Sequence, residues 1–322
     1  MDRDARKAAG RGAGLEDSPS GEPAGGGASL DCSRPARQNR AQASWTAAPA
    51  VKARPFLKWA GGKGQLLSQY EPFFPRQWNT YHEPFLGGGA VFFHLAQGIP
   101  RGLRRFLLSD INPELVNVYC CVRDHVEEVI SLLSRHQAQH SRDYYYAMRS
   151  ARLEDPVQRA ARLIYLNKTC FNGLYRENAR GEFNVPLGRY RNPRICDAEN
   201  LRAASQVLQR AEIAVQPFWQ VLERAEPGDF VYLDPPYHPV SASSSFTAYS
   251  RYAFGEAEQV QLRDVFVALA NRGVQVLLSN SDCPFVRELY RGYPIHTIVA
   301  SRAINSQGHK RGPITEVLVS SK

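Results

Sequence analysis

The sequence lacks several features that would place it in common protein classes. No run of apolar residues is long enough to cross a membrane, and the first residues lack the apolar core of a signal peptide. The six cysteines form no C-x-x-C pair, and no His-Cys cluster has the spacing of a zinc site. These absences predict a cytoplasmic protein with reduced cysteines, no membrane association and no bound metal.

The composition is that of a globular chain with an excess of positive charge. Of the 322 residues, 43% are hydrophobic and 22% are charged, and the net charge is +9. Residues 1–52 contain eight Lys or Arg and six Asp or Glu, so the remaining residues carry +7. That excess favours a polyanionic partner, most simply nucleic acid, although charge kept for solubility would give the same balance. Residues 1–52 are rich in Gly, Ala, Ser, Pro and Arg without periodicity and are predicted to be a disordered tail.

A short strand that ends at two prolines is the most informative stretch. Residues 230–233 form an apolar, strand-forming run that leads directly into Asp234, Pro235, Pro236 and Tyr237. Proline cannot donate a hydrogen bond to a sheet, so the strand ends there, at the carboxyl edge where open α/β sheets bind ligands. An isolated match this short also fits an ordinary strand end with a capping aspartate.

This group of residues suits nucleophilic attack by an aromatic amine. The exocyclic nitrogen of adenine is a poor nucleophile because its lone pair is delocalised into the ring. If the Asp234 carboxylate and the Pro235 carbonyl each accept one of its N–H groups, they favour the tetrahedral nitrogen that can attack. They also stabilise the positive charge that develops on this nitrogen, while Tyr237 stacks on the base.

A second set of residues has the pattern of a nucleotide-binding unit. Residues 80–83 are predicted to form a strand, residues 85–89 a glycine-rich loop and residues 91–95 the start of a helix. Asp110 ends the next predicted strand, 21 positions beyond Gly89 and close to the roughly 20-residue spacing at which an acid reaches ribose hydroxyls. Dehydrogenases share this layout, so it does not separate a nicotinamide cofactor from S-adenosylmethionine.

Residues 167–194 differ in composition from the rest of the chain. They contain six Lys or Arg against two Glu, with Phe, Tyr and Asn between them. This mixture is typical of a loop that reads DNA, because arginine bonds guanine edges, asparagine bonds adenine and flat rings replace lost stacking. A surface loop without function is the alternative.

The apolar periodicity predicts the remaining elements. The predicted helices are one long helix over residues 112–134, two that begin after caps at Asp155 and Asp197, and one over 256–272. The predicted strands lie near residues 213–215, over 274–278, and in a hairpin of 295–300 with 314–319. Residues 241–252 are expected to form a mobile cover over the site. Residues 306–311 form a basic loop that suits contact with phosphates and equally suits an ordinary solvated turn.

Taken in order, the motifs resemble those of one enzyme family. They are residues 56–63 (FLKWAGGK), 83–89 (EPFLGGG), 110–112 (DIN), 172–176 (NGLYR) and 234–237 (DPPY). From residue 54 to about residue 320 the chain closely resembles the Dam-type (D12 class) DNA adenine-N6 methyltransferases. The resemblance implies an α/β fold with a Rossmann-like sheet that uses S-adenosylmethionine, and a mostly helical target-recognition insert. The implied catalytic domain spans residues 53–121 and 211–322, and the insert spans residues 122–210.

The resemblance also implies roles for single residues. The implied catalytic residues are Asp234, Pro235, Pro236 and Tyr237. The implied cofactor-binding residues are Trp59, Lys63, Glu83, Phe85, Gly87, Gly89, Asp110 and Asp234. The implied DNA contacts are Lys58, Phe171, Asn172, Leu174, Arg176, Pro186 and Tyr190. Arg176 is the candidate for a bidentate guanine contact, and Phe171 keeps a ring where relatives are expected to carry tyrosine.

The implied reaction is base flipping followed by direct attack of adenine N6 on the methyl group of S-adenosylmethionine. No cysteine nucleophile is needed, and the Pro-Cys dipeptide expected of cytosine-C5 enzymes is absent from the sequence. The implied partner is double-stranded DNA, with GATC the favoured target. The protein is expected to be a monomer that associates with the nucleoid through DNA. A cognate restriction endonuclease, as a genetic rather than a physical partner, is one option.

Other functions explain only part of these features. A nicotinamide dehydrogenase explains the glycine loop and Asp110 but not the motif at Asp234 or the basic aromatic segment. A methyltransferase acting on another DNA site, on RNA or on a protein glutamine would use related chemistry, although the glutamine enzymes are expected to carry Asn in place of Asp234. A non-catalytic DNA-binding descendant is the third alternative, and the intact site residues argue against it.

Overall fold

One sheet organises the fold of this computed structural model, which describes residues 51–97, 105–239, 254–301 and 313–322. Its seven strands run in the order β3-β2-β1-β4-β5-β7-β6, and the first five are parallel. Strand β7 runs antiparallel to both β5 and β6. The strands are β1 (Thr80–Glu83), β2 (Arg105–Asp110), β3 (Ala211–Val215), β4 (Phe230–Leu233), β5 (Gln275–Ser281), β6 (Ile295–Ser301) and β7 (Pro313–Ser320).

The centre of the sheet is buried on both faces. All four residues of β4 are buried, and their side chains alternate between two hydrophobic cores. Phe230 and Tyr232 belong to the first core, and Val231 and Leu233 belong to the second. Strands covered on both faces are continuously apolar, as this run is. Strands β1 and β4 are neighbours from which the chain continues in opposite directions, so their carboxyl ends form the switch point where such sheets bind ligands.

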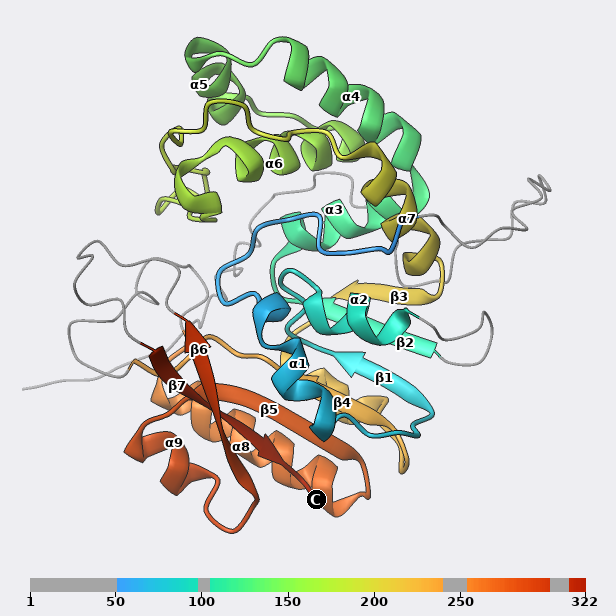
Figure 1. The fold of residues 1–322 in the computed structure, drawn as a ribbon, viewed down its shortest axis with the longest axis vertical. Helices are drawn as coiled ribbons and strands as arrows, with labels where there is room; N and C mark the ends of the chain where they lie inside the picture. The colour runs from blue at the N-terminus through green and yellow to red at the C-terminus, as the bar shows by residue number, and fades with distance from the viewer. Residues whose placement is uncertain (1–50, 98–104, 240–253, 302–312) are drawn as a thin grey trace, which may run out of the picture.

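Helices cover both faces of the sheet and extend beyond one edge. They are α1 (Leu67–Tyr70), α2 (Ala90–Ala96), α3 (Pro113–Asp124), α4 (Val126–Ala138), α5 (Arg142–Ser150), α6 (Pro156–Thr169), α7 (Ala198–Leu208), α8 (Glu256–Asn271) and α9 (Pro284–Leu289). Buried residues of α2, α3, α6 and α7 lie in the first core, and those of α8 and α9 lie in the second. Figure 1 shows α4, α5 and α6 gathered beyond the β3 edge, far from the β6–β7 hairpin.

The mixed α/β fold and its seven-stranded sheet confirm the predicted fold class. The first core runs without interruption from Phe106 on β2 through Val122 on α3 to Leu163 on α6. The helices beyond the β3 edge therefore pack on the same core as the sheet. We propose that residues 122–210 are the recognition insert of a catalytic domain formed by residues 53–121 and 211–322.

One predicted element is wrong in its continuity. The helix expected over residues 112–134 is two helices, α3 and α4, which are separated at His125 (φ −131°, ψ 36°). The buried Arg123 guanidinium donates to Ala211 O on β3 (3.0 Å), which fixes the end of α3 against the sheet. The apolar repeat continues through the break because both helices pack against α6.

Other expectations can be compared directly with the structure. Asp155 caps α6 by accepting a hydrogen bond from Gln158 N (2.8 Å), as predicted. Asp197 precedes α7, but its carboxylate pairs with Arg54 and Arg194 instead of capping the helix. The predicted β-hairpin is confirmed as β6 and β7. Residues 241–252 and 306–311 lie outside the described residues.

The cysteines differ from the expectation at one position. The thiols of Cys121, Cys170, Cys196 and Cys283 are free, whereas Cys120 is in a disulfide. The prediction of reduced cysteines is therefore wrong for Cys120. In the part of the chain that the structure describes, no helix is long and apolar enough to span a membrane.

Candidate active site

Asp234 lies just beyond β4, with a lysine and a serine on the same carboxylate oxygen. Lys63 Nζ is 2.8 Å from Asp234 Oδ1, and Ser279 Oγ donates to that oxygen at 2.7 Å. The Lys63 side chain is 4% exposed and the Asp234 side chain 21% exposed. The carboxylate is therefore held from the protein side and remains open to a ligand on the other.

Several groups contact the Lys63 ammonium. Besides Asp234, it donates to Gly61 O (2.5 Å) and lies 4.7 Å from the centroid of the Tyr237 ring. A buried charge is tolerated only when it is paired and hydrogen-bonded. These contacts provide that pairing, and they fix the glycine turn of residues 61–62, the carboxylate and the ring relative to one another.

Ser279 was not singled out as a site residue from the sequence. It lies on β5, the strand next to β4, and its Oγ is also 2.9 Å from the Tyr232 hydroxyl. The polar run of residues 279–281 in an otherwise apolar, buried strand was the signal that could have identified it. Its partner could be named only once the strand order was known.

The backbone that flanks Tyr237 is held by polar side chains from other elements. Gln259 on α8 donates to Pro236 O (2.9 Å), and Asn280 Oδ1 accepts from His238 N (3.1 Å). Asn280 also donates to Gln259 (2.9 Å), so the two amides support one another. The segment after Asp234 is therefore fixed through its backbone on both sides of Tyr237.

The Tyr237 hydroxyl is anchored to β7. It donates to Glu316 Oε2 (2.8 Å), and burial raises the pKa of the Glu316 carboxyl above its usual value. Glu316 is a second site residue that the sequence did not identify. With the ring against Lys63 and the hydroxyl on Glu316, the orientation of Tyr237 is set at both ends.

Glu83 ends β1 beside this group. Its side chain is 3% exposed, and it accepts a hydrogen bond from the Tyr81 hydroxyl (2.8 Å). Burial raises the pKa of Glu83 to about 8, and the nearby negative charge of Asp234 adds to the increase. At neutral pH the Glu83 carboxyl is therefore mostly protonated.

The glycine loop between β1 and α2 is held by Asp110 and Tyr119. Asp110 accepts from Gly87 N (3.1 Å) and Asn112 N (3.0 Å), and Tyr119 donates to Gly87 O (3.0 Å). Gly87 and Gly89 have φ values of +47° and +66°. A Cβ at Gly87 would lie 2.9 Å from Trp59 Cδ1, so this position needs glycine for both its conformation and its space. Burial raises the pKa of Asp110 to about 6.

Apolar side chains are exposed beside the glycine loop. Ile111 follows Asp110 and is 40% exposed, and Val215, paired with Asp110 across β2 and β3, is 49% exposed. Phe85 stacks on Phe218 with ring centroids 5.3 Å apart. Together with the glycine loop, these residues form a partly apolar edge at the carboxyl ends of β1, β2 and β3.

The predicted DNA contacts lie on a turn packed against residues 58–59. Phe171 N donates to Pro186 O (2.8 Å), and the Phe171 ring is 46% exposed. Asn172 has a left-handed conformation (φ 56°). Lys58 Nζ lies 4.3 Å from the centroid of the Tyr190 ring.

Arg176 and Leu174 are placed differently from these residues. The Arg176 guanidinium donates to Asn184 Oδ1 (2.6 Å), which orients it on the exposed side of the segment. Leu174 is half-buried and packs against the first core. The turn therefore brings together Lys58, Phe171, Asn172, Pro186 and Tyr190, with Arg176 held on Asn184.

A basic pocket of about 520 Å³ lies next to this turn. Its lining residues are Arg54, Lys58, Lys168, Arg189, Tyr190, Arg191, Asn192, Pro193, Arg194 and Asp197. Burial, together with the nearby charge of Lys58, lowers the pKa of Lys168 to about 8. The basic residues of this pocket other than Lys58 were missed as site residues, although the charge of residues 167–194 had pointed to the region.

Comparison with known proteins decides the family. The sequence model of the family of D12 class N6 adenine-specific DNA methyltransferases matches residues 59–304. The chain belongs to this family. The predicted resemblance is therefore confirmed, and the chain is an adenine-N6 DNA methyltransferase that acts on duplex DNA. Membership in the family implies the use of S-adenosylmethionine in general.

Named relatives of this D12 class chain match it over most of their length. The Type II methyltransferase M1.LlaDCHI of Lactococcus lactis subsp. cremoris is 42% identical over 84% of this chain and 96% of the relative. The Type II methyltransferase M.MjaIII of Methanocaldococcus jannaschii is 41% identical over 81% and 96%. The DNA adenine methylase of Escherichia coli (strain K12) is 35% identical over 83% and 95%. Among solved structures, one match is the rRNA methyltransferase aviRa from Streptomyces viridochromogenes. The alignment covers 85% of this chain and 88% of that chain, with 15% identity and a TM-score of 0.33.

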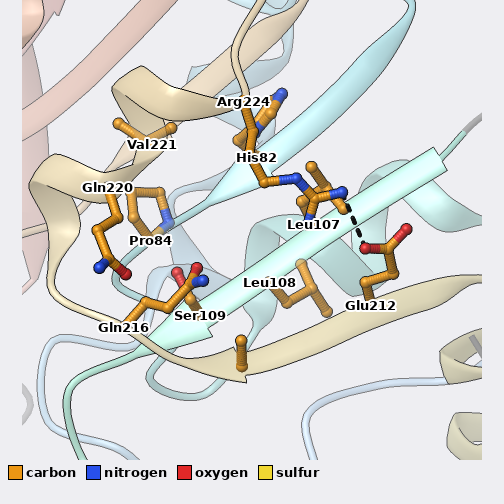
Figure 2. Close-up of a pocket in the computed structure, with 11 residues that line it drawn as sticks. His82, Pro84, Leu107, Leu108, Ser109, Glu212, Gln216, Gln220, Val221 and Arg224 are labelled. Carbon is orange, nitrogen blue, oxygen red and sulfur yellow. Dashed lines mark ion pairs between the residues drawn. The ribbon is translucent and has the colours of Figure 1, made fainter. Parts of the chain in front are cut away.

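A smaller cavity of the D12 class chain lies beside β1, β2 and β3. Its volume is about 60 Å³. It is lined by residues in or next to β1, β2, β3 and η4 (Phe218–Glu223), as Figure 2 shows. The charged groups of its lining are paired, with Arg224 Nη2 2.9 Å from Glu212 Oε2 and His82 Nε2 2.9 Å from Asp229 Oδ2. Asp234, Lys63 and Tyr237 are not among its lining residues.

The described ranges contain no group of three His, Cys, Asp or Glu side chains that could hold a metal ion. The titratable groups that interact with Asp234 include the buried ammonium of Lys63 and the carboxyl groups of Glu83 and Glu316.

Proposed function

We propose that this D12 class enzyme is site-specific and methylates N6 of an adenine held at Asp234, Pro235, Pro236 and Tyr237. The observation that carries the proposal is the fixation of Asp234 Oδ1 by Lys63 and Ser279 at the switch point of the sheet. A carboxylate positioned in advance stabilises developing positive charge without reorganising during the reaction. Asp234 and the Pro235 carbonyl then accept the two N–H groups of the amine.

Tyr237 provides the second part of the substrate site. Its ring is positioned by Lys63 and its hydroxyl by Glu316, so the ring presents a fixed surface on which adenine can stack. The exposed face of Asp234 lies on the same segment, three residues before Tyr237. The arrangement suits a flat base that carries its amino group toward the carboxylate.

The residues around the glycine loop fit S-adenosylmethionine. The glycines of the loop leave its backbone accessible to a ligand, and Asp110 fixes the loop by accepting a hydrogen bond from Gly87 N. Ile111 and Val215 form an exposed apolar edge beside the loop. When bound, the cofactor supplies an electrophilic methyl group on a sulfonium. The residues proposed to hold it are Trp59, Lys63, Glu83, Phe85, Gly87, Gly89, Asp110 and Asp234. A protonated Glu83 adds no negative charge to this region at neutral pH.

Base flipping follows from the position of N6. In a duplex this nitrogen is paired with thymine, so the adenine must leave the stack before Asp234 can reach it. Phe171 is an exposed ring on a turn packed against residue 58, and a flat side chain can fill the gap that a flipped base leaves. We therefore assign Phe171 to stacking or wedging in the opened duplex.

The proposed target is GATC. Lys58, Asn172, Leu174, Arg176, Pro186 and Tyr190 are proposed to read it, and the basic pocket beside them is suited to backbone phosphates. Support comes from residues 172–176 and 180–186, which resemble the corresponding segments of enzymes reading this site, and from relatives named DNA adenine methylase. Other relatives are named Type II methyltransferases, so the base sequence is the part of the proposal to test first.

The test is methyl transfer from labelled S-adenosylmethionine to two duplexes that differ only in whether GATC is intact or scrambled. We expect label on the intact duplex alone, located on adenine N6. Label on both duplexes would retain the reaction and overturn the proposed target. Label on neither, with DNA binding intact, would overturn this activity on both duplexes and favour another DNA site, an RNA substrate or a non-catalytic DNA-binding protein.

A further inference from the structure

One buried asparagine joins residue 58, in the first motif (residues 56–63), to the turn of residues 171–174, the recognition turn. Asn167, which is 1% exposed, accepts from Lys58 N (2.8 Å) and donates to Lys58 O (2.7 Å) and Gly173 O (3.1 Å). A Cβ at Gly173 would lie 2.6 Å from the Lys58 Cβ, so the backbone of the turn lies directly against the Lys58 side chain. Residues 58 and 173 are therefore held as one unit.

A second tie runs through two stacked rings. The Tyr175 ring stacks on the Trp59 indole, with centroids 5.1 Å apart and planes at 29°. Trp59 in turn lies against the glycine loop, because a Cβ at Gly87 would be 2.9 Å from Trp59 Cδ1 and one at Gly88 would be 3.4 Å from Trp59 Cβ. A continuous column of contacts thus joins the recognition segment (residues 171–186), the first motif (residues 56–63) and the glycine loop (residues 85–89).

Tyr175 is also fixed to the rest of the recognition segment. Its hydroxyl donates to Glu177, and its ring meets the Phe183 ring edge-on at 5.9 Å. Glu177 and Phe183 form an isolated antiparallel bridge, and Asn184 N donates to Arg176 O (3.0 Å). A shift of this segment on DNA therefore moves Tyr175, and Tyr175 contacts Trp59 directly.

We propose that Tyr175 is a positioning residue that couples binding of the target duplex to binding of the cofactor. The inference rests on the proposed function, because it assigns the two ends of the column to DNA and to S-adenosylmethionine. Each ligand favours the arrangement in which the recognition turn, Trp59 and the glycine loop are packed together. By linkage, the cofactor then raises the affinity for DNA by the same factor by which DNA raises the affinity for the cofactor.

The experiment measures that factor in the full chain. Affinity for a fluorescent duplex that the enzyme methylates is determined by anisotropy with and without S-adenosylhomocysteine, the demethylated cofactor. We expect a coupling factor within the typical range of about 5–150-fold for the unaltered chain. In Tyr175→Ala the factor falls toward 1, while each ligand alone still binds.

Two variants separate the ring from the hydroxyl and from general effects of losing a tyrosine. Tyr175→Phe retains the stack and loses the bond to Glu177, so it should keep the coupling factor. Tyr146→Ala is the matched control, since Tyr146 is a half-buried tyrosine on α5 that contacts Tyr145 and Arg149. It should keep the factor as well. If Tyr175→Ala does not fold, Tyr175→Leu retains apolar volume without a flat ring and gives the same test.

The outcomes distinguish this inference from the proposed function. Methyl transfer with no coupling in the unaltered chain, or with full coupling in the ring-deleted variant, overturns the role of Tyr175 and leaves the reaction in place. Loss of coupling in Tyr175→Phe also overturns it, because the stack is then not the cause. Failure to methylate any duplex overturns the proposed function and this inference together.

Discussion

Lys63 Nζ lies 2.8 Å from Asp234 Oδ1, and the lysine is the more deeply buried partner. The pair joins the first motif of the chain, residues 56–63, to the motif of residues 234–237 that follows β4. Because the ammonium also contacts Gly61 O and the Tyr237 ring, one charge organises the carboxylate, the glycine turn and the stacking surface. This relationship explains why the two motifs act as one site.

Replacing Lys63 by Met should lower methyl transfer by about 10²-fold or more, the size of the loss when one preorganised hydrogen-bond donor is removed from an active site. Stability should also fall, by about 1–3 kcal/mol, less than for a fully buried pair because Asp234 is partly exposed. Initial rates and chemical denaturation measure the two effects. The double variant with Asp234→Asn should recover the stability but not the activity. An active, stable Lys63→Met enzyme would contradict this role.

Ser279→Ala should reduce kcat because Asp234 loses a hydrogen bond that fixes its carboxylate. The same change removes the partner of the buried Tyr232 hydroxyl, which costs about 1–3 kcal/mol of stability. Tyr232→Phe is the matched control, since it removes the Tyr232–Ser279 bond and leaves the Ser279–Asp234 bond. Steady-state kinetics should show a lower kcat in the serine variant only. Equal kcat values in both variants would mean that Ser279 supports the fold alone.

The raised pKa of Glu83 predicts that the stability of the protein depends on pH. Burial raises its folded-state pKa to about 8 from 4.5, so the folded state holds this proton over that range while the unfolded state loses it. The stabilisation from Glu83 is therefore complete below pH 4.5 and is lost as pH rises toward about 8. Relative to the unaltered chain, Glu83→Gln should gain unfolding free energy across this window. A pH-independent difference in denaturation measurements would show that Glu83 is not held protonated.

Arg176→Ala should weaken discrimination between the target and altered sites by about 1–3 kcal/mol if Arg176 makes one bidentate base contact. The guanidinium is held by Asn184, so Asn184→Ala should give a smaller effect in the same direction through loss of orientation. Methylation rates on duplexes with single base changes provide the measurement. Unchanged discrimination in Arg176→Ala would remove Arg176 from the recognition residues.

Much of the fold was predictable because its signals are local. The apolar run of β4, the cap at Asp155 and the hairpin of β6 and β7 follow from short stretches of sequence. The break between α3 and α4 was not predictable in this way. The contact that fixes the end of α3 joins Arg123 to Ala211, which lies 88 positions away in the chain.

The residues of the site also differ in how far the sequence alone could identify them. Asp234 and the glycine loop stand out because their residues are adjacent in sequence. Ser279 and Glu316 do not, because they reach Asp234 and Tyr237 only through the placement of β5 and β7 beside β4. The stack of Tyr175 on Trp59 likewise joins two motifs that lie far apart in the sequence.

The most direct test of the account is the activity of Asp234→Ala on a duplex that the unaltered enzyme methylates. Methyl transfer to adenine N6 and duplex affinity are measured on the same preparations, with circular dichroism as the check of folding. We expect methyl transfer to be abolished while the fold and much of the DNA affinity remain, because Asp234 acts on the amine and not on the recognition turn. Turnover comparable to that of the unaltered enzyme would contradict the assignment of Asp234 and the mechanism built on it.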